Sequence, residues 1–293
     1  MVGTAGGGAE EAVRRWVEAG GGRLVLDGGL ATELEANGAD LNDPLWSAKC
    51  LLSSPHLIRK ASLNSRIPPN PKDPSLPVLF VHMDYLEAGA NIIITASYQA
   101  TIQGFESKGF SKEQSENLLT KSVEIAREAR EMFLKEHLDQ STPTQQPILV
   151  AASIGSYGAY LADGSEYSGD YGEAGTVQFL KDFHRRRLQV LAEAGPDLIA
   201  FETIPNKLEA QAYVELLEEC NINIPAWFSF NSKDGVNIES TGVSDGDFVS
   251  YVSEWCKDGA SLIGGCCRTT PNTIRAIHRT LNQGSNVQQL PVA

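Results

Sequence analysis

Short apolar runs recur along the chain, and longer stretches in which apolar residues follow helical spacing separate them. Six runs have the length and composition of buried strands: residues 23–26, 91–96, 148–153, 197–201, 226–230 and 261–263. Runs of this kind, bounded by glycine and polar residues, are typical of parallel strands. The alternation therefore predicts βα units and an α/β fold.

The stretches between the runs carry helix signals. Ser111 and Gln114 stand at capping-box spacing before an apolar stretch that continues to Phe133. Residues 177–194 and 245–257 predict two more helices. Within the first of these, His184 is interpreted as a surface histidine, and the arginines at 185–187 as a solvated helix face.

Two regions interrupt the rhythm. Residues 61–81 hold five prolines, so this segment is predicted to be an extended or disordered insertion between two pieces of one helix, 55–60 and 82–88. Between the runs that end at Phe230 and begin at Ser261 there is room for one helix and little else. A closed (β/α)8 barrel needs eight strands. The chain predicts an incomplete one of about six.

Composition narrows the class of protein. The 293 residues carry 24 Lys and Arg against 37 Asp and Glu, a net charge of −13, which excludes a nucleic-acid binder. The 42% hydrophobic content predicts a globular chain, read as one domain over 1–293 with a flexible leader at 1–8. The leader lacks a secretion signal and no apolar run approaches the roughly 20 residues of a membrane span. We expect a cytoplasmic protein without a membrane partner, and its five cysteines favour reduced thiols or a metal site.

Candidate chemistry lies directly after the predicted strands, where a parallel barrel carries its active site. Asp27 and Glu202 each follow an apolar run. A carboxylate there is costly to bury without a partner, so each is a candidate for binding a cationic group. The alternatives are a helix N-cap for Asp27 and a structural hydrogen bond to loop amides for Glu202.

The stretch 264–271, GGCCRTTP, places Cys266 and Cys267 side by side at a strand end. Two preceding glycines allow the backbone to bend, so both sulfurs could face one point. A zinc site with thiolate ligands is one interpretation. A pair of inert buried residues and a vicinal disulfide are the others.

Four segments together carry a resemblance to a known family. They are 27–34, DGGLATEL; 94–100, ITASYQA; 201–206, FETIPN; and 264–271, GGCCRTTP. Together they are similar to the homocysteine S-methyltransferase family, most of all to the plant enzymes that use S-methylmethionine. The resemblance covers most of the chain apart from residues 61–81.

The resemblance implies a (β/α)8 TIM barrel that binds one zinc ion through three cysteines. It implies transfer of a methyl group from S-methylmethionine or S-adenosylmethionine to homocysteine, which forms methionine. By the same resemblance Cys266 and Cys267 are zinc ligands, Asp27 and Glu202 bind the amino acid, and the protein is a monomer.

The chain departs from the family near residues 237–243. The family's first zinc cysteine follows its sixth strand, and that segment is not found here; about two βα units, roughly 60 residues, are absent. Cys220 and Cys256 lie on or at the end of predicted helices, which makes them poor substitutes. A non-catalytic barrel that still binds its ligand is therefore one alternative function, and a redox protein that uses Cys266 and Cys267 is another.

Overall fold

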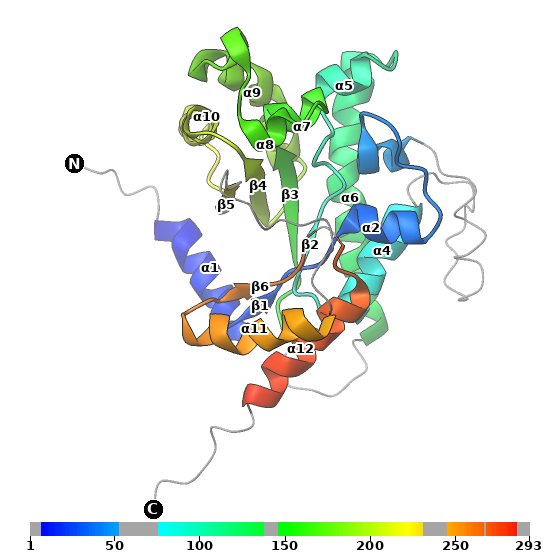
Figure 1. Ribbon diagram of the computed structural model, residues 1–293, viewed down its shortest axis with the longest axis vertical. Helices are drawn as coiled ribbons and strands as arrows, with labels where there is room; N and C mark the ends of the chain where they lie inside the picture. The colour runs from blue at the N-terminus through cyan, green and yellow to red at the C-terminus, as the bar shows by residue number, and fades with distance from the viewer. Residues whose placement is uncertain (1–6, 53–75, 138–145, 231–244, 267, 286–293) are drawn as a thin grey trace, which may run out of the picture.

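The computed structural model describes residues 7–52, 76–137, 146–230, 245–266 and 268–285 (Figure 1). The strands in this part of the chain are β1 Leu24–Val25, β2 Ile92–Ile94, β3 Leu149–Gly155, β4 Leu198–Ile204, β5 Ala226–Phe230 and β6 Leu262–Ile263. Each lies within or overlaps one of the six apolar runs. The prediction of six strands is confirmed.

All the strand pairs are parallel. β2, β3, β4 and β5 form one sheet in that order, and β1 pairs with β6 in a second, two-stranded sheet. A single bridge between Leu26 and Ile92 joins the two sheets, so the strands follow one another as β6, β1, β2, β3, β4, β5. The expected α/β barrel type is confirmed, as a partial barrel.

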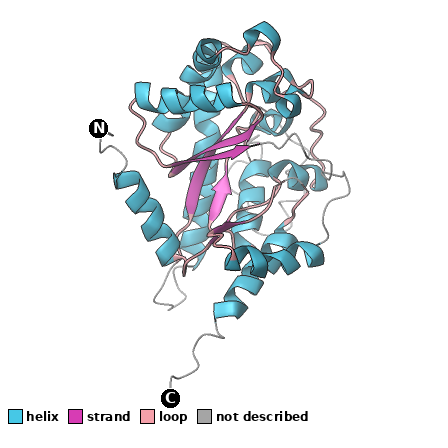
Figure 2. Cartoon of the chain, turned by 60° about the vertical axis from the view of Figure 1, so that its left-hand side comes forward, coloured by secondary structure: helices cyan, strands magenta, loops and turns pink. Residues whose placement is uncertain are grey.

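Helices alternate with the strands and surround them (Figure 2). The longer helices are α1 Gly7–Ala19, α4 Leu76–Glu87, α6 Lys112–His137, α9 Val177–Glu193, α10 Lys207–Glu219, α11 Asp245–Lys257 and α12 Pro271–Ser285. The short ones are α2 Leu30–Ala36, η1 Trp46–Leu51, α5 Ile102–Glu106, α7 Tyr157–Leu161, α8 Ser165–Ser168 and η3 Gly172–Ala174. None of the helices in the described residues is long and apolar enough to span a bilayer.

The structure confirms the bounds of one predicted helix and the capping box of another. α11 has the predicted bounds. At the start of α6, the Ser111 backbone N–H donates to Gln114 Oε1 at 2.8 Å, and the Gln114 N–H donates to Ser111 Oγ at 3.2 Å. This reciprocal pair is the capping box that the spacing predicts.

The strands have two apolar faces, and each is buried by different elements. One face, with residues such as Ile93, Val150 and Ile199, belongs to the large core shared with α4, α6 and α10. The other face carries Leu24, Ile92 and four further strand residues, against which α1 packs Val13, Trp16 and Val17. Burial on both faces explains why the strands read as unbroken apolar runs.

The predicted C-terminal boundary of the proline-rich insertion, residue 81, is wrong. Within residues 61–81, α4 begins at Leu76, and Val78 and Val81 are buried in the core. Pro77 is compatible with this because proline is tolerated in the first turn of a helix, where its missing N–H has no intrahelical partner. Residues 53–75, with the predicted helix piece 55–60, lie outside the described residues.

The interpretation of 184–187 as a solvated surface is also wrong in part. His184 and Arg187 are buried, with 0% and 1% of their surface exposed. Arg187 donates to the backbone oxygens of Gly155, Ser97 and Tyr98. Arg185 and Arg186 are more exposed and pair with Glu219 and Glu116.

Candidate active site

A pocket of about 470 Å³ opens at the carboxyl ends of the strands. Its lining includes Ile94 and Thr95 at the end of β2, Ser153 of β3, Glu202 of β4 and Cys266 after β6. The loop after β1 adds Gly28 and Gly29, and η1 adds Trp46. Because these segments are far apart in sequence, the pocket exists only once the parallel strands have aligned their carboxyl ends.

Asp27 precedes the lining residue Gly28, is not itself part of the described pocket lining, and is 1% exposed. Its Oδ2 accepts a hydrogen bond from the Ile94 N–H at 2.8 Å, while its Oδ1 has no partner among the described residues. Burial raises the pKa of the Asp27 carboxyl well above its usual value, the bond from Ile94 opposes this, and the nearby Glu202 and Cys266 raise it further. Asp27 is not the N-cap of α2, because Gly29 takes that position.

Glu202 is turned toward the pocket by an irregularity in β4. The register between β4 and β5 shifts between Phe201 and Ile204, and Thr203 has a left-handed φ of 55°. Bulges of this kind re-aim a side chain and are common beside active sites. Ser153 Oγ donates to Glu202 Oε2. Burial raises the pKa of Glu202 to about 7, although the Ser153 bond lowers it, and Cys266 adds to the increase.

Cys266 is exposed and lines the pocket, and Cys267 lies outside the described residues. The glycines before this pair serve close packing. A Cβ on Gly265 would come within 1.9 Å of Thr269 Oγ1, and one on Gly264 would come within 2.4 Å of Leu26 Cβ. The loop after β6 therefore lies directly against the end of β1, which brings Cys266 close to Asp27.

The donors that the structure describes do not make up a zinc site. Among the described residues, no three His, Cys, Asp or Glu side chains gather closely enough to hold a metal ion. Cys220 follows the last residue of α10, where its sulfur accepts from Arg185 and Gln189, and Cys256 lies near the end of α11. Cys220 therefore lies at a helix end and Cys256 on a helix, as the sequence predicts.

Tyr98, Glu166 and Trp46 also line the pocket, and the sequence predicts no role for them. Tyr98 Oη donates to Glu166 Oε2 at 3.0 Å, and Trp46 packs edge-on against Tyr98 with ring centroids 6.2 Å apart. Tyr98 follows a predicted strand directly, which is the signal that could have found it. Glu166 lies in α8, in a segment without a strand signal.

The described lining of the pocket is acidic and aromatic. It includes Asp43, Glu166 and Glu202 but no Lys, Arg or His. Asp43 is paired with Lys108 at 2.9 Å. Carboxylates and aromatic faces together favour a ligand that carries positive charge.

Comparison with known proteins decides the family. The family profile described as homocysteine S-methyltransferase matches residues 24–253 and 241–281. The chain belongs to the homocysteine S-methyltransferase family. It is 70% identical to homocysteine S-methyltransferase 3 of Zea mays, with 100% of both chains covered. It is 52% identical to a selenocysteine Se-methyltransferase of Brassica oleracea var. italica, with 89% of each covered.

Among solved structures, the chain resembles the homocysteine methyltransferase MmuM of Escherichia coli in its metallated form. The TM-score is 0.70 at 38% identity, and the match covers 88% of this chain and 96% of that one. The metallated form of that relative shows that it holds a metal. In this chain the residues described supply one of the predicted thiols, Cys266.

The same comparisons bear on the predicted deletion. The alignment with the maize protein runs over 358 positions although this chain has 293 residues, so about 65 positions have no counterpart here. The family profile also matches in two separate pieces, which overlap over residues 241–253 of this chain. Both observations agree with the loss of about two βα units near residues 237–243.

Proposed function

We propose that this chain binds homocysteine in the strand-end pocket and transfers to its sulfur the methyl group of a sulfonium donor, S-methylmethionine or S-adenosylmethionine, which forms methionine. One observation carries the proposal. Asp27 and Glu202 are carboxyl groups with raised pKa values beside the Cys266 thiol, and Asp27 Oδ1 has no partner among the described residues. An ammonium group would complete the hydrogen bonding of that oxygen.

The chain's own residues would orient the reactants. The ammonium group of homocysteine binds between Asp27 and Glu202, and its side chain extends along the pocket toward Cys266. The homocysteine thiol gives up its proton to the solvent. Its sulfur then uses a lone pair to form a bond to the methyl carbon, while the bond from that carbon to the donor sulfur breaks and its electron pair stays on the donor sulfur. The donor leaves as a neutral thioether, so it needs no acid. The acidic lining favours the sulfonium charge.

The family resemblance names Cys266 and Cys267 as the zinc ligands. Zinc, when bound, would keep the homocysteine thiol deprotonated at neutral pH. Two adjacent cysteines supply two of the family's three thiolates, so we expect weaker zinc binding than in a complete barrel. The binding steps above depend on the carboxyl groups alone.

Methionine formation tests the proposal. Purified protein in reducing buffer with added zinc is incubated with homocysteine and either S-methylmethionine or S-adenosylmethionine, and methionine is quantified alongside zinc content. We expect methionine with at least one donor, and much less of it at limiting homocysteine when Asp27 is replaced by asparagine. Absence of methionine with both donors at saturating zinc would contradict catalysis.

A second candidate is binding without turnover, and the partial barrel favours it. The chain lacks a counterpart for about 65 positions of its maize relative, while Glu202 lines the described pocket and Asp27 lies next to the lining residue Gly28. In this case homocysteine would raise the melting temperature through mass action, yet no methionine would form. A redox role for Cys266 and Cys267 instead requires reversible oxidation of the pair.

A further inference from the structure

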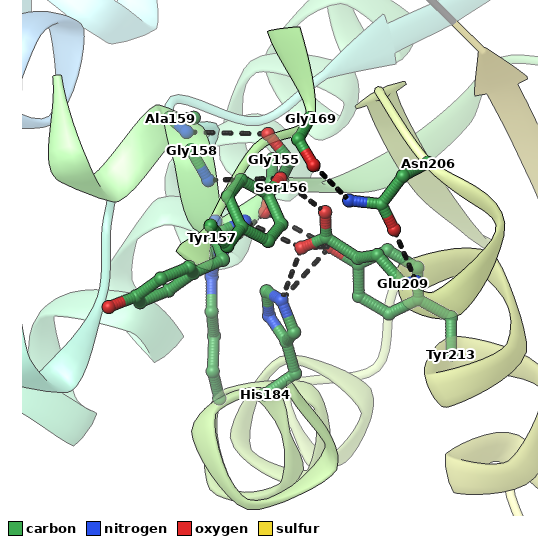
Figure 3. Close-up of polar contacts among 12 residues, drawn as sticks. Gly155, Ser156, Tyr157, Gly158, Ala159, Gly169, His184, Asn206, Glu209 and Tyr213 are labelled. Carbon is green, nitrogen blue, oxygen red and sulfur yellow. Dashed lines mark hydrogen bonds and ion pairs between the residues drawn. The ribbon is translucent and has the colours of Figure 1, made fainter. Parts of the chain in front are cut away.

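A buried cluster of polar side chains lies between α9, α10 and residues 155–171 (Figure 3). Glu209 of α10 and His184 of α9 are both 0% exposed. His184 Nε2 lies 2.9 Å from Glu209 Oε1. The other carboxylate oxygen, Oε2, accepts a hydrogen bond from Tyr171 Oη at 2.7 Å. None of these groups lines the pocket.

The cluster forms hydrogen bonds to the backbone of residues 155–171, which we call the wall segment. The Tyr157 N–H donates to Glu209 Oε1 at 2.6 Å, and the Gly158 N–H donates to Tyr171 Oη at 3.2 Å. Tyr213 Oη donates to the Gly155 oxygen at 3.2 Å. One buried carboxylate thus organises bonds to the beginning and the end of the segment.

Close packing inside the wall segment connects these hydrogen bonds to the pocket. A Cβ on Gly158 would lie 2.2 Å from the Glu166 nitrogen, so α7 and α8 are in direct backbone contact. Ala162, Gly164, Glu166 and Tyr167 of the same segment line the pocket. The path from Glu209 through Tyr171 and Gly158 to Glu166 consists of contacts at every step.

A purely structural role would not require a charge. Burying a carboxylate is costly, and apolar residues of similar volume often replace buried ion pairs without loss of stability. Here the hydrogen bonds from His184, Tyr171 and the Tyr157 N–H outweigh the burial that opposes them, so the pKa of Glu209 is lowered and the carboxylate is ionised at neutral pH. An ionised carboxylate accepts several bonds with fixed direction, which suits the holding of a loop.

We propose that Glu209, with His184 and Tyr171, is a positioning group that holds the wall segment in place and thereby sets the affinity of the pocket for its ligand. The inference rests on the proposed function, because it takes the pocket as the ligand site. Glu209 acts through the wall segment and touches no reactant.

The test uses the full chain with Tyr171→Phe, which keeps the ring and removes the hydroxyl that links Glu209 to Gly158. Lys181→Met is the matched control, because Lys181 of α9 pairs with Glu215 and Glu219 of α10. It therefore joins the same two helices but not the wall segment. Hydrogen–deuterium exchange reports the wall segment without a ligand, and calorimetric titration with homocysteine reports affinity.

For Tyr171→Phe we expect exchange of the wall-segment amides to rise about tenfold while α6 and β4 stay protected, and homocysteine affinity to fall about fivefold to tenfold. Lys181→Met should change neither quantity. We expect Glu209→Gln to retain more affinity than Glu209→Ala, since an amide still accepts one of the bonds. Unchanged exchange in Tyr171→Phe, or faster exchange with unchanged affinity, would overturn the inference. Failure of the wild-type chain to bind homocysteine would instead refute the proposed function, and exchange would still decide whether the cluster holds the wall segment.

Discussion

The row of six described strands has a well-buried middle and two exposed ends. We call strands β1 to β4 the closed side, and the end strands β5 and β6 together the open side. Every residue of β3 is buried and β4 is buried at five of seven positions, whereas β5 has none fully buried and β6 has one of two. Phe230 at the end of β5 is 64% exposed, and Phe201 in β4 is 0% exposed.

The functional groups divide along the same line. Asp27 follows β1 and Glu202 lies within β4, both on the closed side, where bonds from the Ile94 N–H and from Ser153 hold them. Cys266 follows a strand of the open side and is exposed. Under the proposed function, recognition of the amino acid and activation of its sulfur would depend on regions of unequal completeness, so we expect the two functions to fail separately.

The same substitution on the two sides gives the largest contrast in stability. Phe201 stacks on Tyr213 and Phe228, with centroids 4.3 and 4.9 Å apart. We expect Phe201→Ala to lower the free energy of unfolding by about 3–5 kcal/mol because it leaves a cavity in the core. Phe230→Ala should change it by less than about 1 kcal/mol. Urea unfolding of both variants measures this, and similar losses would show that the open side is packed as well as the closed one.

Removal of the Asp27 charge should have the next largest effect. We expect Asp27→Asn to weaken homocysteine binding about 100-fold, since a charge-assisted hydrogen bond in a buried site is lost. The side-chain amide oxygen can still accept from Ile94, so the fold should survive. The control is Asp43→Asn, which alters a pocket carboxylate already paired with Lys108. Equal losses in both variants, measured by calorimetry, would argue against a specific role for Asp27.

We expect Glu202 to make the affinity for homocysteine depend on pH. Because its pKa is raised to about 7, the carboxyl is largely protonated at pH 6, and a cationic ligand must displace that proton. We expect homocysteine affinity to fall about tenfold from pH 8 to pH 6, and to lose this dependence in Glu202→Gln. A flat profile in the wild-type chain would contradict the assignment.

The raised pKa of Glu202 makes the free energy of unfolding fall as pH rises, whereas it makes the affinity for homocysteine rise. The folded state holds the Glu202 proton more tightly than the unfolded state, so this group contributes most below its usual pKa of 4.5, and that contribution is lost as pH rises through about 7. Glu202→Gln should therefore raise the melting temperature at pH 8 by about 3 °C while lowering affinity. A lower melting temperature at pH 8 would show that the charge is not destabilising.

The smallest effect on binding is expected from the open side. Cys266→Ser should lower zinc content and methionine formation, yet change homocysteine affinity in chelator-treated protein by less than about threefold, because the carboxyl groups remain in place. Parallel metal analysis and calorimetry would check this. A large loss of affinity without zinc would show that the thiol itself binds the ligand.

Much of this arrangement could be predicted from sequence because its signals are local. Apolar runs marked the six strands, and carboxylates directly after such runs marked Asp27 and Glu202. The buried state of His184 could not be predicted this way, because its partner Glu209 lies 25 residues away on another helix. The helical start at Leu76 was hidden by Pro77, whose usual effect as a helix breaker does not apply in a first turn.

A crystal structure of the chain with bound methionine, the proposed product, tests the central claim most directly. We expect the ammonium group within hydrogen-bond distance of Asp27 Oδ1 and Glu202, with the thioether directed toward Cys266. Methionine bound away from both carboxyl groups, or with its ammonium group turned toward the loop after β6, would contradict the division between the closed and open sides.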